Sequence, residues 1–170
     1  MCIYTIATYN SLVKMRNRVH NAWAQIDVQL KKRFDLIPNL VETVKGYAKH
    51  ENEVLTEVTK ARASVGGAQT TAEKIDANNQ LSGALSRLMV VMERYPELKA
   101  NTNFMDLQGQ LKEIETKIAY SRQFYNDSVM LYNQKTEMFP ARIIASIFKF
   151  KPEMYFKADE AEKAAPKVQF

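Results

Sequence analysis

The stretch Asn21-Ala-Trp-Ala-Gln-Ile-Asp-Val-Gln-Leu-Lys-Lys-Arg-Phe-Asp-Leu-Ile-Pro-Asn-Leu-Val-Glu-Thr-Val-Lys-Gly-Tyr-Ala-Lys-His50 decides the fold class of this 170-residue chain. Its apolar side chains recur every three or four residues, a spacing close to the heptad repeat. One face of the stretch therefore forms a seam for other helices, and no cluster of catalytic residue types interrupts it. The seam consists of Trp23, Ile26, Leu30, Phe34, Ile37, Val41 and Val44.

The same periodicity recurs along the chain and predicts an all-α fold. Four helices of similar length joined by short links favour an antiparallel up-down four-helix bundle with crossing angles near 20°. We expect a short extra C-terminal helix and an irregular tail that either packs over the bundle as a strap or is partly mobile. The expected long helices cover residues 8–32, 36–63, 72–93 and 104–137, and the short one covers 141–148.

The boundary between the first two helices has two interpretations. Asp35 is a good N-cap and Pro38 is tolerated in a first helical turn, which favours a hairpin at residues 33–36. The seam, however, keeps its phase through Pro38, which favours one long helix kinked there. Such a helix would be about 84 Å long, and the later helices are too short to cover it. We therefore expect the hairpin and keep the kinked helix as the alternative.

Other helix ends carry clearer signals. The glycine pair Gly66-Gly67 predicts a turn at residues 64–69, and Thr70 with Glu73 forms a capping-box pattern. Asn103 is the expected cap of the fourth long helix, and Pro140 is expected to stop it. Gly46 falls inside the second expected helix, where close packing against a neighbour would explain a glycine.

Composition narrows the class of protein. Apolar residues make up 46% of the chain and charged residues 25%, which is typical of a globular protein. The net charge of +5 suits anionic partners, although interspersed charges equally fit a solvated helical surface. Cys2 is the only cysteine, so an intrachain disulfide and a cysteine-based zinc site are excluded.

The histidines of the sequence do not fit the known catalytic metal motifs. His50-Glu51 would need a second histidine at position 54, which is Val54. Neither His20 nor His50 has a glutamate three residues before it, as a di-iron bundle requires. We expect no enzyme, no catalytic residue, no metal ligand and no cofactor.

Two groups of residues are candidates for surface contacts. Lys31, Lys32 and Arg33 form the densest basic run, which either touches phosphate groups or is a solvated helix end. The pairs Tyr125-Asn126 and Tyr132-Asn133 are seven residues apart and share one helix face. We expect the tyrosines to be core residues with a polar tip. Asn126 and Asn133 would form a polar ladder on the surface, a candidate groove for a partner.

The chain resembles the bacterial LemA family over nearly its whole length. The matching motifs occur in family order and include Tyr9-Asn10, Ala22-Trp23, the run at residues 33–41, Gly46-Tyr47 with His50-Glu51, the link at 95–100, Tyr125-Asn126-Asp127, Tyr132-Asn133 and Phe139-Pro140.

The resemblance implies a helical bundle behind a single N-terminal transmembrane helix. Here only residues 1–8 precede the first motif, and they are either an ordinary first helical turn or the stub of a membrane anchor. The bundle domain would then cover 9–148 and the strap 149–170. Lys14, Arg16 and Arg18 follow the stub, so the positive-inside tendency predicts a cytoplasmic domain on a membrane.

Two functions are compatible with these features. The first is a membrane-tethered scaffold or adaptor that binds another protein of unknown identity. The second is a basic bundle that binds anionic lipid surfaces or nucleic acid directly, although interspersed charge makes nucleic acid the weaker partner.

Overall fold

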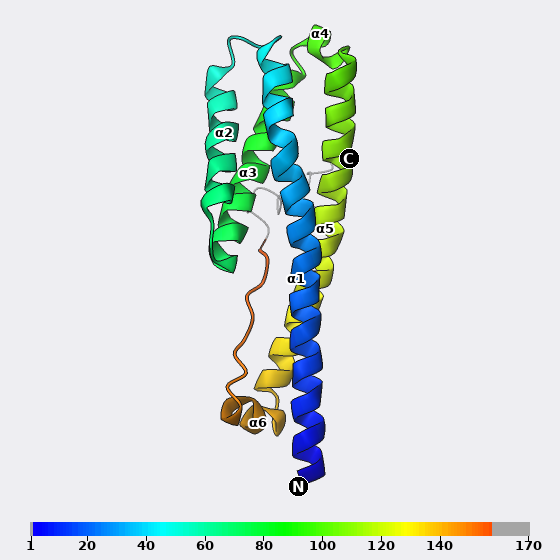
Figure 1. Ribbon diagram of the computed structural model, residues 1–170, viewed down its shortest axis with the longest axis vertical. Helices are drawn as coiled ribbons and strands as arrows, with labels where there is room; N and C mark the ends of the chain where they lie inside the picture. Colours follow the sequence, from blue (N-terminus) through cyan, green and yellow to red (C-terminus); the bar gives the residue numbers. More distant parts are fainter. Residues whose placement is uncertain (1, 158–170) are drawn as a thin grey trace, which may run out of the picture. The chain divides into compact units, whose positions relative to one another are not determined.

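The computed structural model describes residues 2–157, and the described chain is all-α. It contains six helices and no strand in this range (Figure 1). Three long helices, of 44, 22 and 36 residues, account for most of it. The helices are α1 (Cys2–Lys45), α2 (Asn52–Gly67), α3 (Thr71–Met92), α4 (Pro96–Lys99), α5 (Thr102–Glu137) and α6 (Ala141–Ile147).

The chain divides into two compact units. The strap unit contains residues 2–29 and 116–156, and the core unit contains residues 30–115 together with Lys157. Both α1 and α5 contribute one part to each unit. The core unit also holds α2, α3 and α4, and the strap unit also holds α6.

The expected hairpin at residues 33–36 is wrong, because α1 runs without a break to Lys45. Pro38 lies inside the helix and costs it one backbone hydrogen bond. Ile37 and Leu40 beside it are fully buried. The free energy gained by burying these side chains in a continuous helix outweighs the lost hydrogen bond. The length argument for a hairpin fails because the 36-residue α5 also contributes to both units.

The first real turn lies after Lys45, at Gly46 and the residues up to Glu51. Gly46 therefore ends a helix instead of interrupting one. A Cβ atom placed on it would meet only the carbonyl oxygen of Thr43 at 3.5 Å, an ordinary contact. Close packing is thus not the reason for this glycine, and α2 is shorter than the expected helix 36–63.

The core unit is held together by one cluster of buried apolar side chains. All five helices of the unit contribute, and several members have no exposed surface. Burying such side chains is the main favourable term in folding. Cluster members include Ile37, Leu40 and Val44 of α1, Leu55 and Val58 of α2, Leu81, Leu85 and Leu88 of α3, Leu98 of α4, and Phe104 and Leu111 of α5.

Several predicted helix ends are confirmed. The Thr70 hydroxyl accepts the N–H of Glu73, and the Glu73 carboxylate accepts the N–H groups of Gln69 and Thr70, completing the capping box. These backbone donors lower the pKa of Glu73. The cap of α5 is Asn101, which accepts the N–H of Phe104 at 3.0 Å; the choice of Asn103 was wrong. Pro140 follows the end of α5, as expected.

The expected membrane anchor and the expected strap lie at the two ends of the chain. Residues 2–8 form the first turns of α1. No helix among residues 2–157 is both long and apolar enough to cross a bilayer. Residues 150–156 follow α6 in irregular conformation, and residues 158–170 of the expected strap lie outside the described residues.

Candidate functional site

The two Tyr-Asn pairs of α5 bind the segment of residues 150–156, named here the strap. The side-chain amide of Asn133 donates to the carbonyl of Glu153 at 3.0 Å and accepts its N–H at 2.9 Å. Asn126 repeats this arrangement on Phe156, at 3.0 Å and 2.8 Å. Each asparagine thus satisfies both main-chain groups of one residue, as a neighbouring β-strand would.

The spacing of the pairs matches the spacing of the strap. Seven residues of α-helix rise by about 10.5 Å, and three extended residues span about 10 Å. The asparagines accordingly bind residues 153 and 156. The hydroxyls of Tyr132 and Tyr125 donate to the carbonyls of residues 151 and 154, at 2.9 Å and 2.7 Å. The strap therefore runs antiparallel to α5, and we call these four side chains the clamp.

Burial keeps the clamp tyrosines protonated. Tyr125 and Tyr132 are almost fully buried, which confirms that they are core residues with a polar tip. Burial and the nearby carboxylate of Glu153 raise the pKa of Tyr125 to about 12. The same two causes raise the pKa of Tyr132. Both hydroxyls therefore remain hydrogen-bond donors at neutral pH.

Aromatic and charged contacts fix the strap at its two ends. At one end, the buried ring of Phe150 lies under the Arg16 guanidinium, 5.1 Å from the ring centroid. At the other, the buried ring of Phe156 lies 6.2 Å from Trp23, which also contacts Tyr125 at 5.5 Å. Between them, Glu153 approaches His20 at 3.5 Å. The strap therefore has two aromatic anchors three residues to either side of a carboxylate.

Both amides of the expected asparagine ladder are engaged by the chain itself. Asn133 is buried and Asn126 is partly buried under the strap. The heptad spacing marks a face that binds the chain's own strap, and the expected surface position of Asn133 is wrong because that residue is buried. The sequence could not reveal the strap as the bound segment. Pairing seven helical residues with three extended ones is recognisable only when the path of a segment about 20 residues away is known.

The basic run divides into two exposed residues and one buried one. Lys31 and Lys32 are exposed, whereas Arg33 is 1% exposed, so the surface interpretation of Arg33 is wrong. Arg33 occupies a seam position, three residues after Leu30 and four before Ile37. The seam phase could have revealed its burial, but the apolar Phe34 is the seam residue that the sequence predicts for this turn.

Arg33 is the centre of a polar network inside the core unit. Its guanidinium donates to the Ser82 hydroxyl at 2.7 Å and to the Glu115 carboxylate at 2.9 Å. It also donates to the backbone carbonyl and the side-chain oxygen of Asn78, both at 3.0 Å. Such pairing is what allows a charge to be buried. Sequence reasoning missed Asn78, Ser82 and Glu115 as partners because they come from α3 and α5.

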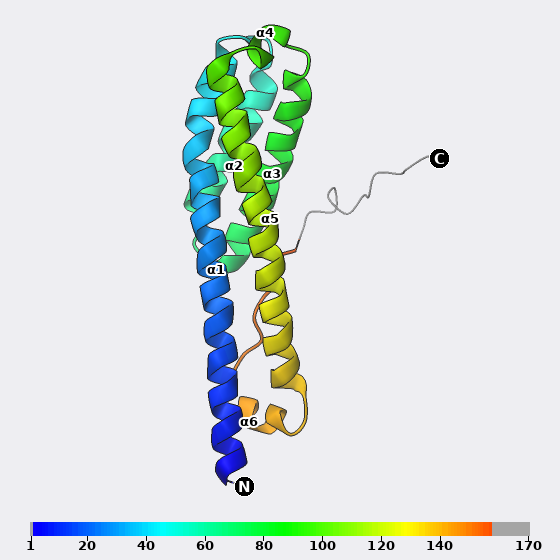
Figure 2. The same ribbon diagram turned by 90° about the vertical axis from the view of Figure 1, so that its right-hand side faces the viewer.

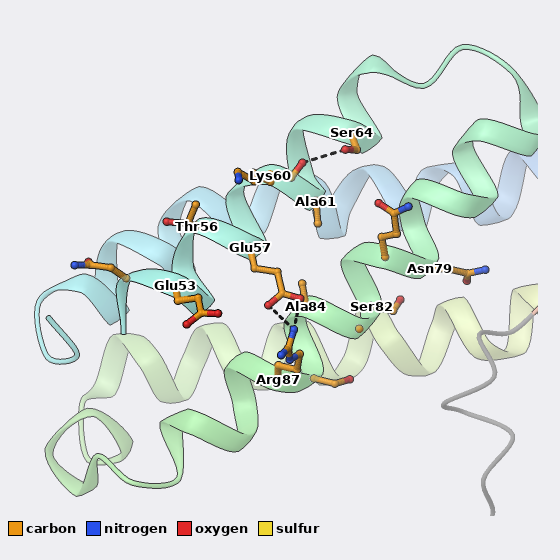
Figure 3. A pocket seen from close by; sticks show the side chains of 14 residues that line it. Glu53, Thr56, Glu57, Lys60, Ala61, Ser64, Asn79, Ser82, Ala84 and Arg87 are labelled. Atoms are coloured by element: carbon orange, nitrogen blue, oxygen red, sulfur yellow. Dashed lines mark hydrogen bonds and ion pairs between the residues drawn. The ribbon is translucent and has the colours of Figure 1, made fainter. Parts of the chain in front are cut away.

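An open groove lies between α2 and α3 in the core unit. Its volume is about 1140 Å³, and small residues such as Ala61, Gly83 and Ala84 line it together with polar ones. Figure 3 shows Glu57 of α2 and Arg87 of α3 pointing toward each other, with both carboxylate oxygens 2.7 Å from the guanidinium. A Cβ atom at Gly83 would meet nothing within 4 Å, so the groove is open there.

Metal-ligating side chains are scattered in the part of the chain that the structure describes. No group of three or more His, Cys, Asp or Glu residues in this part lies close enough to hold a metal ion. Cys2 is exposed at the start of α1. The clamp and the groove offer hydrogen bonds and packing contacts.

Comparison with known proteins agrees with the sequence motifs. The model of the LemA family matches residues 22–170. The chain is 23% identical to Protein LemA of Metamycoplasma hominis over 155 residues, covering 91% of this chain and 71% of that protein. It is 25% identical to magnetosome protein MamQ 2 of Paramagnetospirillum magneticum, covering 90% of this chain and 66% of that protein. For MamQ of Magnetospirillum gryphiswaldense the identity is 24%, with coverages of 87% and 64%. The chain thus spans less than two thirds of the two magnetosome proteins.

Proposed function

From the premise that the chain belongs to the LemA family, we propose that it is a non-enzymatic, membrane-tethered adaptor that binds another protein in the groove between α2 and α3. The observation that carries this proposal is the open groove itself, which holds no segment of the described chain along its lining. The similarity to Protein LemA and to the MamQ proteins is compatible with this proposal.

The proposed adaptor is an antiparallel four-helix bundle in its core unit. Four segments share the buried cluster: residues 30–45 of α1, α2, α3, and residues 102–115 of α5. Short links join consecutive segments, which supports an up-down order. Residues 46–51, between the end of α1 and the start of α2, form the first link in place of the expected hairpin at 33–36.

The groove suits a helix of the partner better than a small molecule. Its lining combines small side chains such as Ala61, Gly83 and Ala84 with long polar ones on two packed helices, and the small ones leave room for the ridge of a third helix. Lys60 and Gln80 line the groove as polar groups for the rim of such a contact.

Membrane tethering is the second part of the proposal. The family resemblance implies an N-terminal anchor, and Ile3 and Ile6 at the start of α1 are exposed apolar residues. Lys14, Arg16 and Arg18 follow them, which favours a cytoplasmic position for the domain.

Two glycines allow a matched test of the groove. Gly83 lies in the groove and Gly109 lies on α5 outside it, and neither position has an atom within 4 Å of an added Cβ. A photo-crosslinking benzoylphenylalanine placed at each position should fold equally well. After illumination in native membranes, Gly83 should yield an adduct of one defined mass, and Gly109 should not. Identical adducts at both positions, or none at Gly83, would contradict the proposal.

Phenylalanine at the same two positions provides the occlusion control. Gly83→Phe should fill the groove and abolish an adduct formed from a crosslinker at the groove residue Ser64. Gly109→Phe should leave that adduct unchanged. Equal loss in both variants would show that the adduct does not depend on the groove.

A further inference from the structure

The strap unit carries a cluster of large apolar side chains that stay exposed. They lie on α6, on the turn before it and on the first turns of α1. Phe139 is 81% exposed, Ile147 67% and Ile3 85%. We name this cluster the apolar patch; its members include Ile3, Ile6, Phe139, Ile143, Ile147 and Phe148.

Helix α6 is apolar on both of its faces. Ala141, Ile144 and Ala145 are buried against the strap unit, whereas Ile143 and Ile147, four residues apart, are exposed. Its exposed face is not wholly apolar, however, because Arg142 and Ser146 lie on it beside the isoleucines. The two exposed isoleucines nevertheless form an apolar surface that the strap unit itself does not cover.

The parts of the apolar patch lie together within the strap unit. Figures 1 and 2 both show α6 beside the first part of α1. The rings of Tyr9 on α1 and Phe148 at the end of α6 are 4.8 Å apart, which fixes this neighbourhood. Monomeric soluble proteins rarely leave so many large apolar side chains exposed in one place.

The positive charge of the chain is concentrated in the same segments. Residues 2–18 and 135–151 contain seven Lys and Arg residues and one Glu, an excess of six positive charges. The whole chain has a net charge of only +5, so the remainder carries no positive excess. Among these basic residues, Lys14, Arg142 and Lys149 are exposed.

This combination points to one kind of partner. A second copy of the chain would bring the same positive charges face to face across a two-fold interface. Nucleic acid would neutralise the charges but leave the isoleucines in water. An anionic bilayer surface satisfies both, because head groups pair with Lys and Arg while the acyl boundary accepts Ile and Phe.

We propose that the apolar patch and its basic rim dock the strap unit onto anionic membrane lipid, with α6 lying in the interface. The surface is separate from the proposed adaptor groove, because none of its residues lines that groove. Docking and groove binding can therefore fail independently, whereas the docking rests on the proposed membrane tethering, with which it shares Ile3 and Ile6.

The test uses the 170-residue chain and vesicles of phosphatidylcholine with or without phosphatidylglycerol. An environment-sensitive dye on Cys2, the only cysteine, reports burial of the first turn of α1. We expect a blue shift with phosphatidylglycerol vesicles and a much weaker one with phosphatidylcholine alone. A dye moved to Gln108, in a Cys2→Ser background, should not shift.

Matched variants separate the patch from general hydrophobicity. The double variant Ile143→Asn with Ile147→Asn should weaken vesicle binding at least roughly tenfold. Val90→Asn with Met105→Asn removes apolar side chains of comparable exposure from α3 and α5, and should change little. Lys14→Gln with Arg142→Gln should weaken binding about fivefold per charge at low salt.

Three results would overturn the proposal. The first is equal vesicle binding by the patch variant and the Val90 and Met105 control. The second is binding that ignores phosphatidylglycerol. The third is a dimer, seen by light scattering, that the patch variant loses while no vesicle binding occurs in either protein. Circular dichroism of each variant confirms that the helices are intact.

Discussion

Asn133 and Glu153 form a closed pair of hydrogen bonds, in which the side-chain amide of Asn133 serves both the N–H and the carbonyl of Glu153. Asparagine fits this role because its amide carries a donor and an acceptor side by side. Neither Asp, which has no donor, nor an apolar residue can serve both groups. Asn133 thus binds the main chain of the strap, and this binding is largely independent of the side chain at position 153.

The first prediction concerns release of the strap. Asn133→Asp should break the bond to the Glu153 carbonyl and place a carboxylate against it, costing about 1–3 kcal/mol of local stability. Hydrogen exchange of the Glu153 and Phe156 amides should accelerate correspondingly. Asn10→Asp, the same charge change at an exposed position of α1 that does not line the pocket beside Glu153, is the control. Unchanged protection of both strap amides in Asn133→Asp would contradict the clamp.

The second prediction concerns the buried arginine. Arg33→Ala should lower the free energy of unfolding by about 3–5 kcal/mol, because it empties the site and strands Asn78 and Ser82. Arg33→Met should cost clearly less, since it refills the volume and the partly exposed Glu115 stays hydrated. Urea unfolding measures both. Equal losses would show that the polar network, and not the filled volume, dominates.

The third prediction is a loss of stability in alkaline solution. The folded pKa of Tyr125, about 12, lies above the value near 10 expected in the unfolded chain. Between these values the unfolded state has lost its proton while the folded state keeps it. Stability is therefore fully present below about pH 10 and falls by about 1.4 kcal/mol per pH unit up to about pH 12.

Tyr125→Phe isolates this contribution. The variant should be less stable at neutral pH, because it loses the hydroxyl bond to the Met154 carbonyl. Its stability should fall less steeply between about pH 10 and about pH 12, since one titrating group is gone. Urea unfolding across this range measures the slopes, and phenolate absorbance follows the titration. Parallel slopes in the two proteins would exclude Tyr125 as the cause.

The sequence predicted the features that depend on local chemistry. The capping box at Thr70 and Glu73 and the stop at Pro140 follow from neighbours within one or two turns. The all-α class follows from the apolar period, and the family from motifs spread over the chain. These signals need no knowledge of distant contacts.

The features that escaped prediction depend on distant partners. A proline inside α1 is tolerated only because the surrounding seam is buried, which the local preference of Pro38 cannot show. Arg33 is buried only because α3 and α5 supply its acceptors. Basic residue type alone therefore predicted the wrong environment for it.

The last prediction is that the glycines inside the long helices can be replaced by alanine without a loss of stability. Gly83 and Gly109 lie inside α3 and α5 with open space around a virtual Cβ. Alanine fits both sites and reduces the freedom of the unfolded chain, so each replacement should raise the free energy of unfolding by about 0.5–1 kcal/mol. Gly66→Ala should gain less, because its Cβ would touch the Phe34 ring at 3.4 Å near the end of α2. Denaturant midpoints of the three variants give this order directly, and a loss at Gly83 would mean that the groove requires the bare backbone.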